Sequence, residues 1–83
     1  MSEITQPTFE QIADVIAEKF DVPRHLIVPG AMLEDIELDS LAVIEVGLIV
    51  EKRFGFEVPT EDLGSGGTVA ELYDFVTAAA RAA

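Results

Sequence analysis

The feature that most constrains the fold is the segment 38–54, where two helix-capping residues precede an amphipathic pattern. Asp39 and Ser40 each carry a short side-chain oxygen that can accept a hydrogen bond from a free amide in a helix's first turn. Apolar residues then recur at helical spacing on one face, namely Val43, Val46, Gly47, Val50 and Phe54. The segment therefore predicts a helix over about 41–54 with one buried face.

The opposite face of this predicted helix also carries apolar residues. Leu41, Leu48 and Ile49 lie there beside Glu45 and Lys52. Apolar groups at such positions stay in contact with water unless another surface covers them, and apolar patches rimmed by charge mark interaction sites. We therefore expect this face to dock another protein.

Two further helices are predicted from capping boxes, in which a threonine and a residue three positions later satisfy each other's free amides. Thr8 with Gln11 opens the first helix, which should stop near Phe20 or Asp21 because Pro23 cannot continue it. Thr68 with Glu71 opens the last helix. Its core side is expected to hold Val69, Leu72, Tyr73, Val76 and Ala80.

The connections between these helices differ in character. Residues 22–38 form a long first loop, and long loops without regular structure are uncommon in compact domains. We therefore expect this loop to be packed, with room for a short turn of helix and with anchors at Leu26, Ile27, Met32, Leu33 and Ile36. Residues 60–63 are expected to form a single helical turn, and residues 64–67 a flexible glycine-rich linker.

The predicted fold is all-α, a small helical bundle with three main helices, one short helix and a long first loop. The 83 residues suit one domain, 1–83, with residues 1–7 and 81–83 frayed. No apolar run is long enough for a membrane span, and the first residues have no signal-peptide pattern. A monomer in the cytoplasm is expected, and the lack of cysteine fits that compartment.

The charge balance restricts the partners. Sixteen acidic residues face five basic ones, a formal net charge of -11, which argues against nucleic acid and against an anionic membrane surface. Nine of the acids fall within residues 34–62. Basic protein surfaces are the natural counterpart.

The residues offer little catalytic chemistry of their own. His25 is the only histidine, and no cysteine is present to join it in a metal site. No base is placed to activate Ser40, since an adjacent carboxylate at a helix start does not form a triad. A calcium loop counted from Asp35 would need glycine and glutamate where Ser40 and Val46 stand. We expect no metal site and no catalytic residue.

A family resemblance runs through nearly the whole chain. Asp39-Ser40-Leu41, followed by Val43-Ile44-Glu45, Glu51, Phe54-Gly55 and Val58-Pro59, resembles an acyl carrier protein. The resemblance implies that Ser40, within a motif completed by Asp39 and Leu41, carries a covalent 4'-phosphopantetheine arm from coenzyme A. The arm would hold acyl groups as thioesters, so the chain would be a carrier and not an enzyme.

The resemblance also implies partners, namely a phosphopantetheinyl transferase and a ketosynthase, acyltransferase or other acyl-processing enzyme with a basic docking surface. The docking residues that we predict are Glu37, Leu41, Glu45, Leu48, Ile49 and Glu51. Compared with fatty-acid carriers, Ala42 replaces an acid after the motif, and Lys52 and Arg53 interrupt a run of acids. This favours a polyketide or related pathway, with fatty acid synthesis close behind.

Two alternatives remain at this stage. A peptidyl carrier of nonribosomal peptide synthesis would use the same serine and arm, but its usual glycines and histidine before the serine are absent from residues 36–39. In an arm-free interaction module, Ser40 would be only a helix cap and the face with Leu41, Leu48 and Ile49 would bind a protein.

Overall fold

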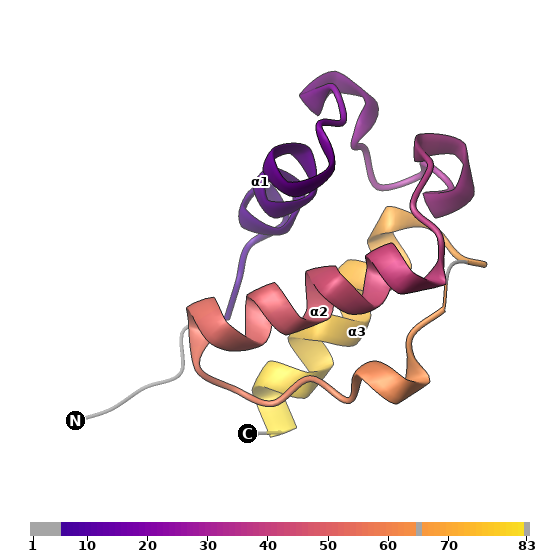
Figure 1. The fold of residues 1–83 in the computed structure, drawn as a ribbon. Coiled ribbons are helices and arrows are strands. Elements are labelled where there is room, and N and C mark those ends of the chain that lie inside the picture. The colour runs from indigo at the N-terminus through magenta and orange to yellow at the C-terminus, as the bar shows by residue number, and fades with distance from the viewer. Residues whose placement is uncertain (1–5, 65, 83) are drawn as a thin grey trace.

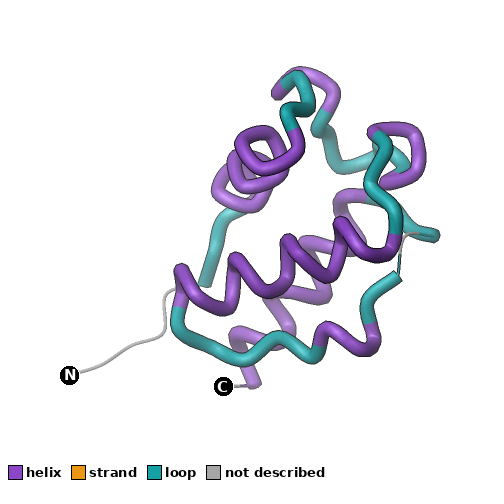
Figure 2. The backbone as a smooth tube through the Cα atoms, in the orientation of Figure 1, coloured by secondary structure: helices purple, strands orange, loops and turns teal. Residues whose placement is uncertain are grey.

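The computed structural model describes residues 6–64 and 66–82. Three α-helices are present: α1 (Phe9–Phe20), α2 (Ser40–Phe54) and α3 (Val69–Ala82), as Figure 1 shows. Three short 3-10 helices lie between them: η1 (Arg24–Leu26), η2 (Leu33–Ile36) and η3 (Thr60–Asp62). Within the described residues there is no strand (Figure 2), only an isolated antiparallel bridge between Met32 and Thr68. The predicted all-α bundle is confirmed.

Both predicted capping boxes are present. The Thr8 hydroxyl accepts a hydrogen bond from the Gln11 amide at 3.2 Å, and the Gln11 side chain accepts one from the Thr8 amide at 2.8 Å. Thr68 and Glu71 form the same pair of bonds, at 3.2 and 2.8 Å. Each box satisfies free amides at a helix start, so α1 and α3 begin where the sequence predicts.

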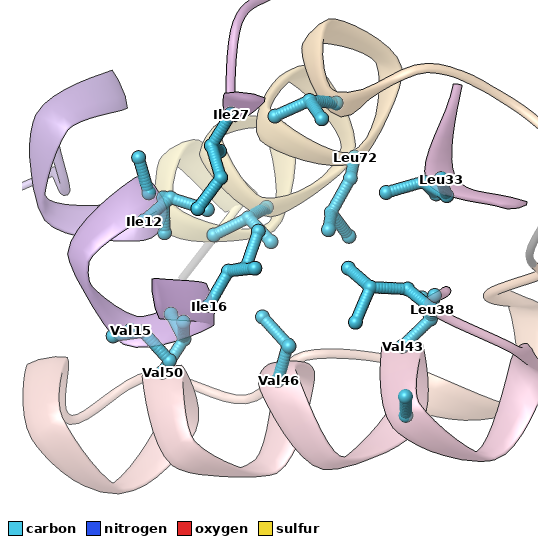
Figure 3. Close-up of a cluster of buried hydrophobic side chains, with 14 of the residues drawn as sticks. Ile12, Val15, Ile16, Ile27, Leu33, Leu38, Val43, Val46, Val50 and Leu72 are labelled. Carbon is cyan, nitrogen blue, oxygen red and sulfur yellow. The ribbon is translucent and has the colours of Figure 1, made fainter. Parts of the chain in front are cut away.

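The core lies where the three helices and the first loop meet (Figure 3). α2 contributes Val43, Val46 and Val50, all without exposed area, and their side chains belong to the same buried cluster as Ile12 and Ile16 of α1. The other buried residues of the core are Ala13 and Val15 of α1, Ile27, Leu33, Ile36 and Leu38 of the loop, Ala42 of α2, Phe56 and Val58 after α2, and Val69, Leu72, Val76 and Ala80 of α3. The predicted buried face of α2 is confirmed, except that Phe54 is only partly buried.

The first loop differs in detail from the prediction. It contains two short 3-10 helices, and only three of the five expected anchors, Ile27, Leu33 and Ile36, are buried. Leu26 is 45% exposed and Met32 38% exposed, because a single turn can direct only one of its sides into the core. The loop is packed, but its outer surface is partly apolar.

The chain ends also differ from the prediction. Pro7 was expected to belong to a frayed start, but its side chain is fully buried, so ordered packing begins before α1. α3 continues through Arg81 to Ala82. Residues 1–5 and residue 83, which share the frayed-end prediction, lie outside the described residues.

Gly47 lets η3 pack closely against α2. A Cβ atom at this position would lie 2.9 Å from Leu63 Cδ1 and 2.9 Å from Thr60 Cγ2. Such distances are too short for carbon atoms in contact, so even a methyl group here would require the Leu63 and Thr60 side chains to shift. The short helix predicted near residues 60–63 is therefore held directly beside α2.

None of the described helices is both long and apolar enough to cross a membrane.

Candidate functional site

The start of α2 places Ser40 in a defined position. Asp39 is the N-cap, because its side chain accepts a hydrogen bond from the Ala42 amide at 2.8 Å. Ser40 is the first helical residue and is exposed. Its hydroxyl forms no hydrogen bond with any described residue. Of the two capping candidates, Asp39 serves the helix and Ser40 remains available for chemistry.

The turn before Ser40 is fixed by the end of η2. Glu37 adopts a left-handed backbone conformation with φ 65°, and the next amide, that of Leu38, donates to the Leu33 carbonyl at 2.9 Å. This is the bond pattern of a Schellman motif, in which an apolar contact usually joins the same two positions. Leu33 and Leu38 are indeed both buried. The loop is thus anchored in the core two residues before the serine.

The surroundings of Ser40 are acidic and open. Glu34, Glu37, Leu38 and Asp39 line a shallow hollow next to it. The described residues contain no cluster of three side chains suited to a metal ion, and His25 is exposed on η1. The site has an accessible hydroxyl and negative charge, with no base in hydrogen-bond contact with that hydroxyl.

The predicted docking residues fall into two groups. Leu41 is 67% exposed and Leu48 47% exposed, with Glu45 exposed between them. These three residues form one outward face of α2, and Glu37 is exposed near its start. The face is uncovered in the described part of the chain, as the sequence predicted.

Ile49 and Glu51 do not lie on that face. Ile49 packs partly against the core and shares a hollow with Val15 of α1, because the helical turn from Leu48 rotates its side chain toward that helix. The Glu51 carboxylate accepts a hydrogen bond from the Val58 amide at 2.8 Å, which braces the loop after α2. Both residues have internal structural partners and are only partly exposed, whereas Glu37, Leu41, Glu45 and Leu48 are exposed.

The cap assignment gives a stability prediction. Asp39→Ala should lower the free energy of unfolding by about 0.5–2 kcal/mol, because the Ala42 amide loses its side-chain acceptor. Asp35→Ala, at an exposed position in η2, is the control and should change it by less than about 0.5 kcal/mol. Urea unfolding followed by circular dichroism measures both. Equal stabilities of the two variants would contradict the cap.

Comparisons with known proteins agree with this geometry. Residues 10–76 match the family model described as a phosphopantetheine attachment site. The acyl carrier protein of Syntrophobacter fumaroxidans is 36% identical over 67 residues, which cover 80% of this chain and 83% of that protein. The acyl carrier protein of Helicobacter hepaticus is 31% identical over 72 residues, covering 86% and 95%.

A further relative is the acyl carrier protein AcpXL of Rhizobium etli, 31% identical over 71 residues, which cover 80% of this chain and 77% of that protein. No solved structure matches the chain significantly.

Fold and site together give a small helical domain with an exposed serine hydroxyl at a helix start. The chain belongs to the acyl carrier protein family, whose members carry a covalent 4'-phosphopantetheine and act as carriers rather than catalysts. The residues present fit this group, because Ser40 is exposed and a helix N-terminus favours a negatively charged phosphate. Membership implies interaction with a phosphopantetheinyl transferase and with acyl-processing enzymes.

Proposed function

We propose that Ser40 carries the 4'-phosphopantetheine arm and that the chain presents acyl intermediates to enzymes of polyketide or fatty acid biosynthesis. The observation that carries this proposal is the exposed Ser40 hydroxyl, which has no hydrogen-bond partner among the described residues and lies at the N-terminus of α2. Ser40 also lies within the residues that match the phosphopantetheine attachment family.

The division of labour follows from the site. The arm supplies a thiol that holds acyl groups as thioesters, while the protein supplies position and recognition. Asp39 and the buried Leu38 fix the place of Ser40 on the surface. Attachment to a fixed point turns each meeting of acyl group and active site into a local event at high effective concentration. The chain itself performs no catalytic step in this proposal.

Partner enzymes are proposed to dock on Leu41, Glu45 and Leu48. The two leucines provide exposed apolar contact area, and Glu45 lies between them. Electrostatic complementarity raises association rates and selects partners without a large interface, which suits a carrier that must visit several enzymes. The net charge of -11 supports partners with basic docking surfaces.

Ala42 alone does not distinguish a polyketide pathway from fatty acid synthesis. This residue is only 8% exposed, so its small side chain has a packing role in the first turn of α2. Replacement of an acid by alanine at this position therefore says little about which enzymes the chain serves. Lys52 and Arg53 are exposed and remain the stronger surface difference from fatty-acid carriers.

The proposal is tested by the intact mass of the purified chain after incubation with coenzyme A and a broad-specificity phosphopantetheinyl transferase. A gain of one phosphopantetheine supports the carrier function. If no gain occurs while the transferase modifies another carrier, the proposal is wrong and an arm-free interaction module becomes the better reading. Loading of the arm with aminoacyl rather than acyl groups by its own enzymes would identify a peptidyl carrier.

Docking through Glu45 gives a salt-dependent prediction. Glu45→Lys should slow acylation of the arm by a partner enzyme, and the slowing should be larger at low salt than at high salt, because salt already screens the native attraction.

The control variant should reverse an acidic charge away from α2 without removing a structural contact. Glu10→Lys, on α1, is unsuitable because it loses an ion pair with Arg24. Glu71→Lys would break a capping box. The exposed Asp74 on α3 is the better control as Asp74→Lys. Equal slowing by Glu45→Lys at both salt concentrations would argue against electrostatic docking.

A further inference from the structure

Basic residues gather at the end of α2 that lies farthest from Ser40. Lys19 and Arg53 line one hollow between α1 and α2, and Lys52 precedes Arg53 in the last turn of α2. We call these three residues the basic end. They are three of only five lysines and arginines in the chain. All of the positive charge of α2 therefore lies in its last turn, directly after Glu51.

Not all of this positive charge is neutralised within the described residues. Arg53 lies 3.5 Å from the Glu18 carboxylate, a partial compensation on the α1 side. Lys52 and Lys19 form no ion pair with any residue that the structure describes. Both are exposed. Lys52 is thus a cation available to a partner.

Lys52 lies on the same face of α2 as the proposed docking residues. Leu41, Glu45, Leu48 and Lys52 follow one another at intervals of four, three and four residues, which places them in one row along a helix. We call this row the docking stripe. At 1.5 Å per residue, Lys52 lies about 10 Å beyond Glu45 and about 18 Å beyond Ser40.

The charge along the docking stripe changes sign. At the Ser40 end, Glu34, Glu37 and Asp39 are exposed, and Glu45 follows on the stripe itself. At the other end stands Lys52. A partner with a uniformly basic surface would gain at Glu45 and lose at Lys52, since like charges in contact are unfavourable. The partner surface that fits best is therefore basic where it faces Ser40 and Glu45. It carries an acidic group about 10 Å further along the helix, where it faces Lys52.

A partner that reaches Ser40 can also contact Lys52. A typical interface buries about 800 Å² on each partner, which corresponds to a patch about 30 Å across. Such a patch centred near Leu41 and Leu48 covers both Glu45 and Lys52. Two opposite charges on one row also fix the orientation of the partner, because a reversed arrangement would bring like charges together.

We propose that the phosphopantetheinyl transferase which modifies this chain docks along the docking stripe and places a carboxylate against Lys52. The inference rests on the proposed function, because that enzyme must bring its active site to Ser40. The transferase is chosen because attachment of the arm itself requires it. The contact with Lys52 orients the carrier so that the start of α2 enters the active site.

The test uses the transferase encoded by the organism from which the chain comes, with coenzyme A as the donor. Loading rates are measured for the parent chain, Lys52→Glu, Lys52→Met and Arg81→Glu, at low and high salt. Lys52→Met keeps the apolar stem and removes only the charge. Arg81→Glu is the matched control, since it makes the same change in net charge at an exposed position of α3.

Lys52→Glu is expected to lower kcat/KM at low salt by about 3- to 10-fold, mainly through KM, and by less at high salt. Lys52→Met should fall between the parent and Lys52→Glu, and Arg81→Glu should stay within about twofold of the parent. Unchanged circular dichroism spectra show that the variants fold.

Two results would overturn the inference while leaving the carrier function in place. Equal rates for Lys52→Glu and Arg81→Glu would show that Lys52 does not contact the transferase. Faster loading of Lys52→Glu would show that the transferase presents a uniformly basic surface. Absence of loading on the parent chain itself would instead overturn the proposed function, and the inference with it.

Discussion

Ser40→Ala is expected to keep its unmodified mass after incubation with coenzyme A and a phosphopantetheinyl transferase, while the parent gains one phosphopantetheine. In the proposed function the arm is joined through the Ser40 hydroxyl, and alanine has no atom that can form the phosphoester bond. The expected effect is therefore complete loss of loading. Mass spectrometry of the intact proteins measures it directly.

The same variant should remain folded. Asp39, not Ser40, caps α2, and the Ser40 hydroxyl forms no hydrogen bond with a described residue. We therefore expect Ser40→Ala to change the free energy of unfolding by less than about 0.5 kcal/mol, the usual range for an exposed substitution. Loss of loading would then result from removal of the hydroxyl and not from unfolding of the variant.

Ser65→Ala is the matched control for loading, because it removes a serine hydroxyl from outside the attachment motif. It should gain the arm as the parent does. If Ser40→Ala were loaded, another residue would carry the arm, and peptide mapping of the product would identify it.

The helix boundaries could be predicted from the sequence because they depend on local chemistry. Thr8 and Thr68 each stand three residues before a side chain that can return the hydrogen bond, and both capping boxes form as predicted. The buried face of α2 followed from the spacing of Val43, Val46 and Val50, since helical periodicity alone selects one side. These features need no knowledge of distant parts of the chain.

Features that depend on tertiary contacts were harder to predict. Ile49 and Glu51 lie on the expected helix, but the positions of α1 and of the loop after α2 decide that they are partly buried. The close approach of η3 to Gly47 likewise depends on residues more than ten positions away. The sequence therefore predicts the position of Ser40 at the start of a helix, but not which side chains around that helix are left exposed.

Choice between two adjacent caps also lies beyond sequence pattern. Asp39 and Ser40 have similar capping propensity, and either could begin the helix. The end of η2 decides between them, because the left-handed conformation of Glu37 and the buried Leu38 fix where the chain enters α2. The position of the serine thus depends on the packing of the loop before it.

Leu38→Ala tests this dependence and should have a large effect on stability. Leu38 has no exposed area, and replacement of a fully buried leucine by alanine costs about 2–5 kcal/mol through lost burial and the cavity left behind. A domain of this size has a total stability of roughly 4–12 kcal/mol, so the variant should be close to unfolding. Urea unfolding followed by circular dichroism measures the loss.

Leu41→Ala is the matched control, since the same residue type is removed three positions later from a site that is 67% exposed. It should change the free energy of unfolding by less than about 0.5 kcal/mol and slow partner reactions instead. A small cost at Leu38 together with a large one at Leu41 would contradict the anchoring of the loop. The expected result is a large loss of stability at Leu38 and a small one at Leu41. It would separate two roles around Ser40, because Leu38 fixes the position of the serine and Leu41 is proposed to contact partner enzymes.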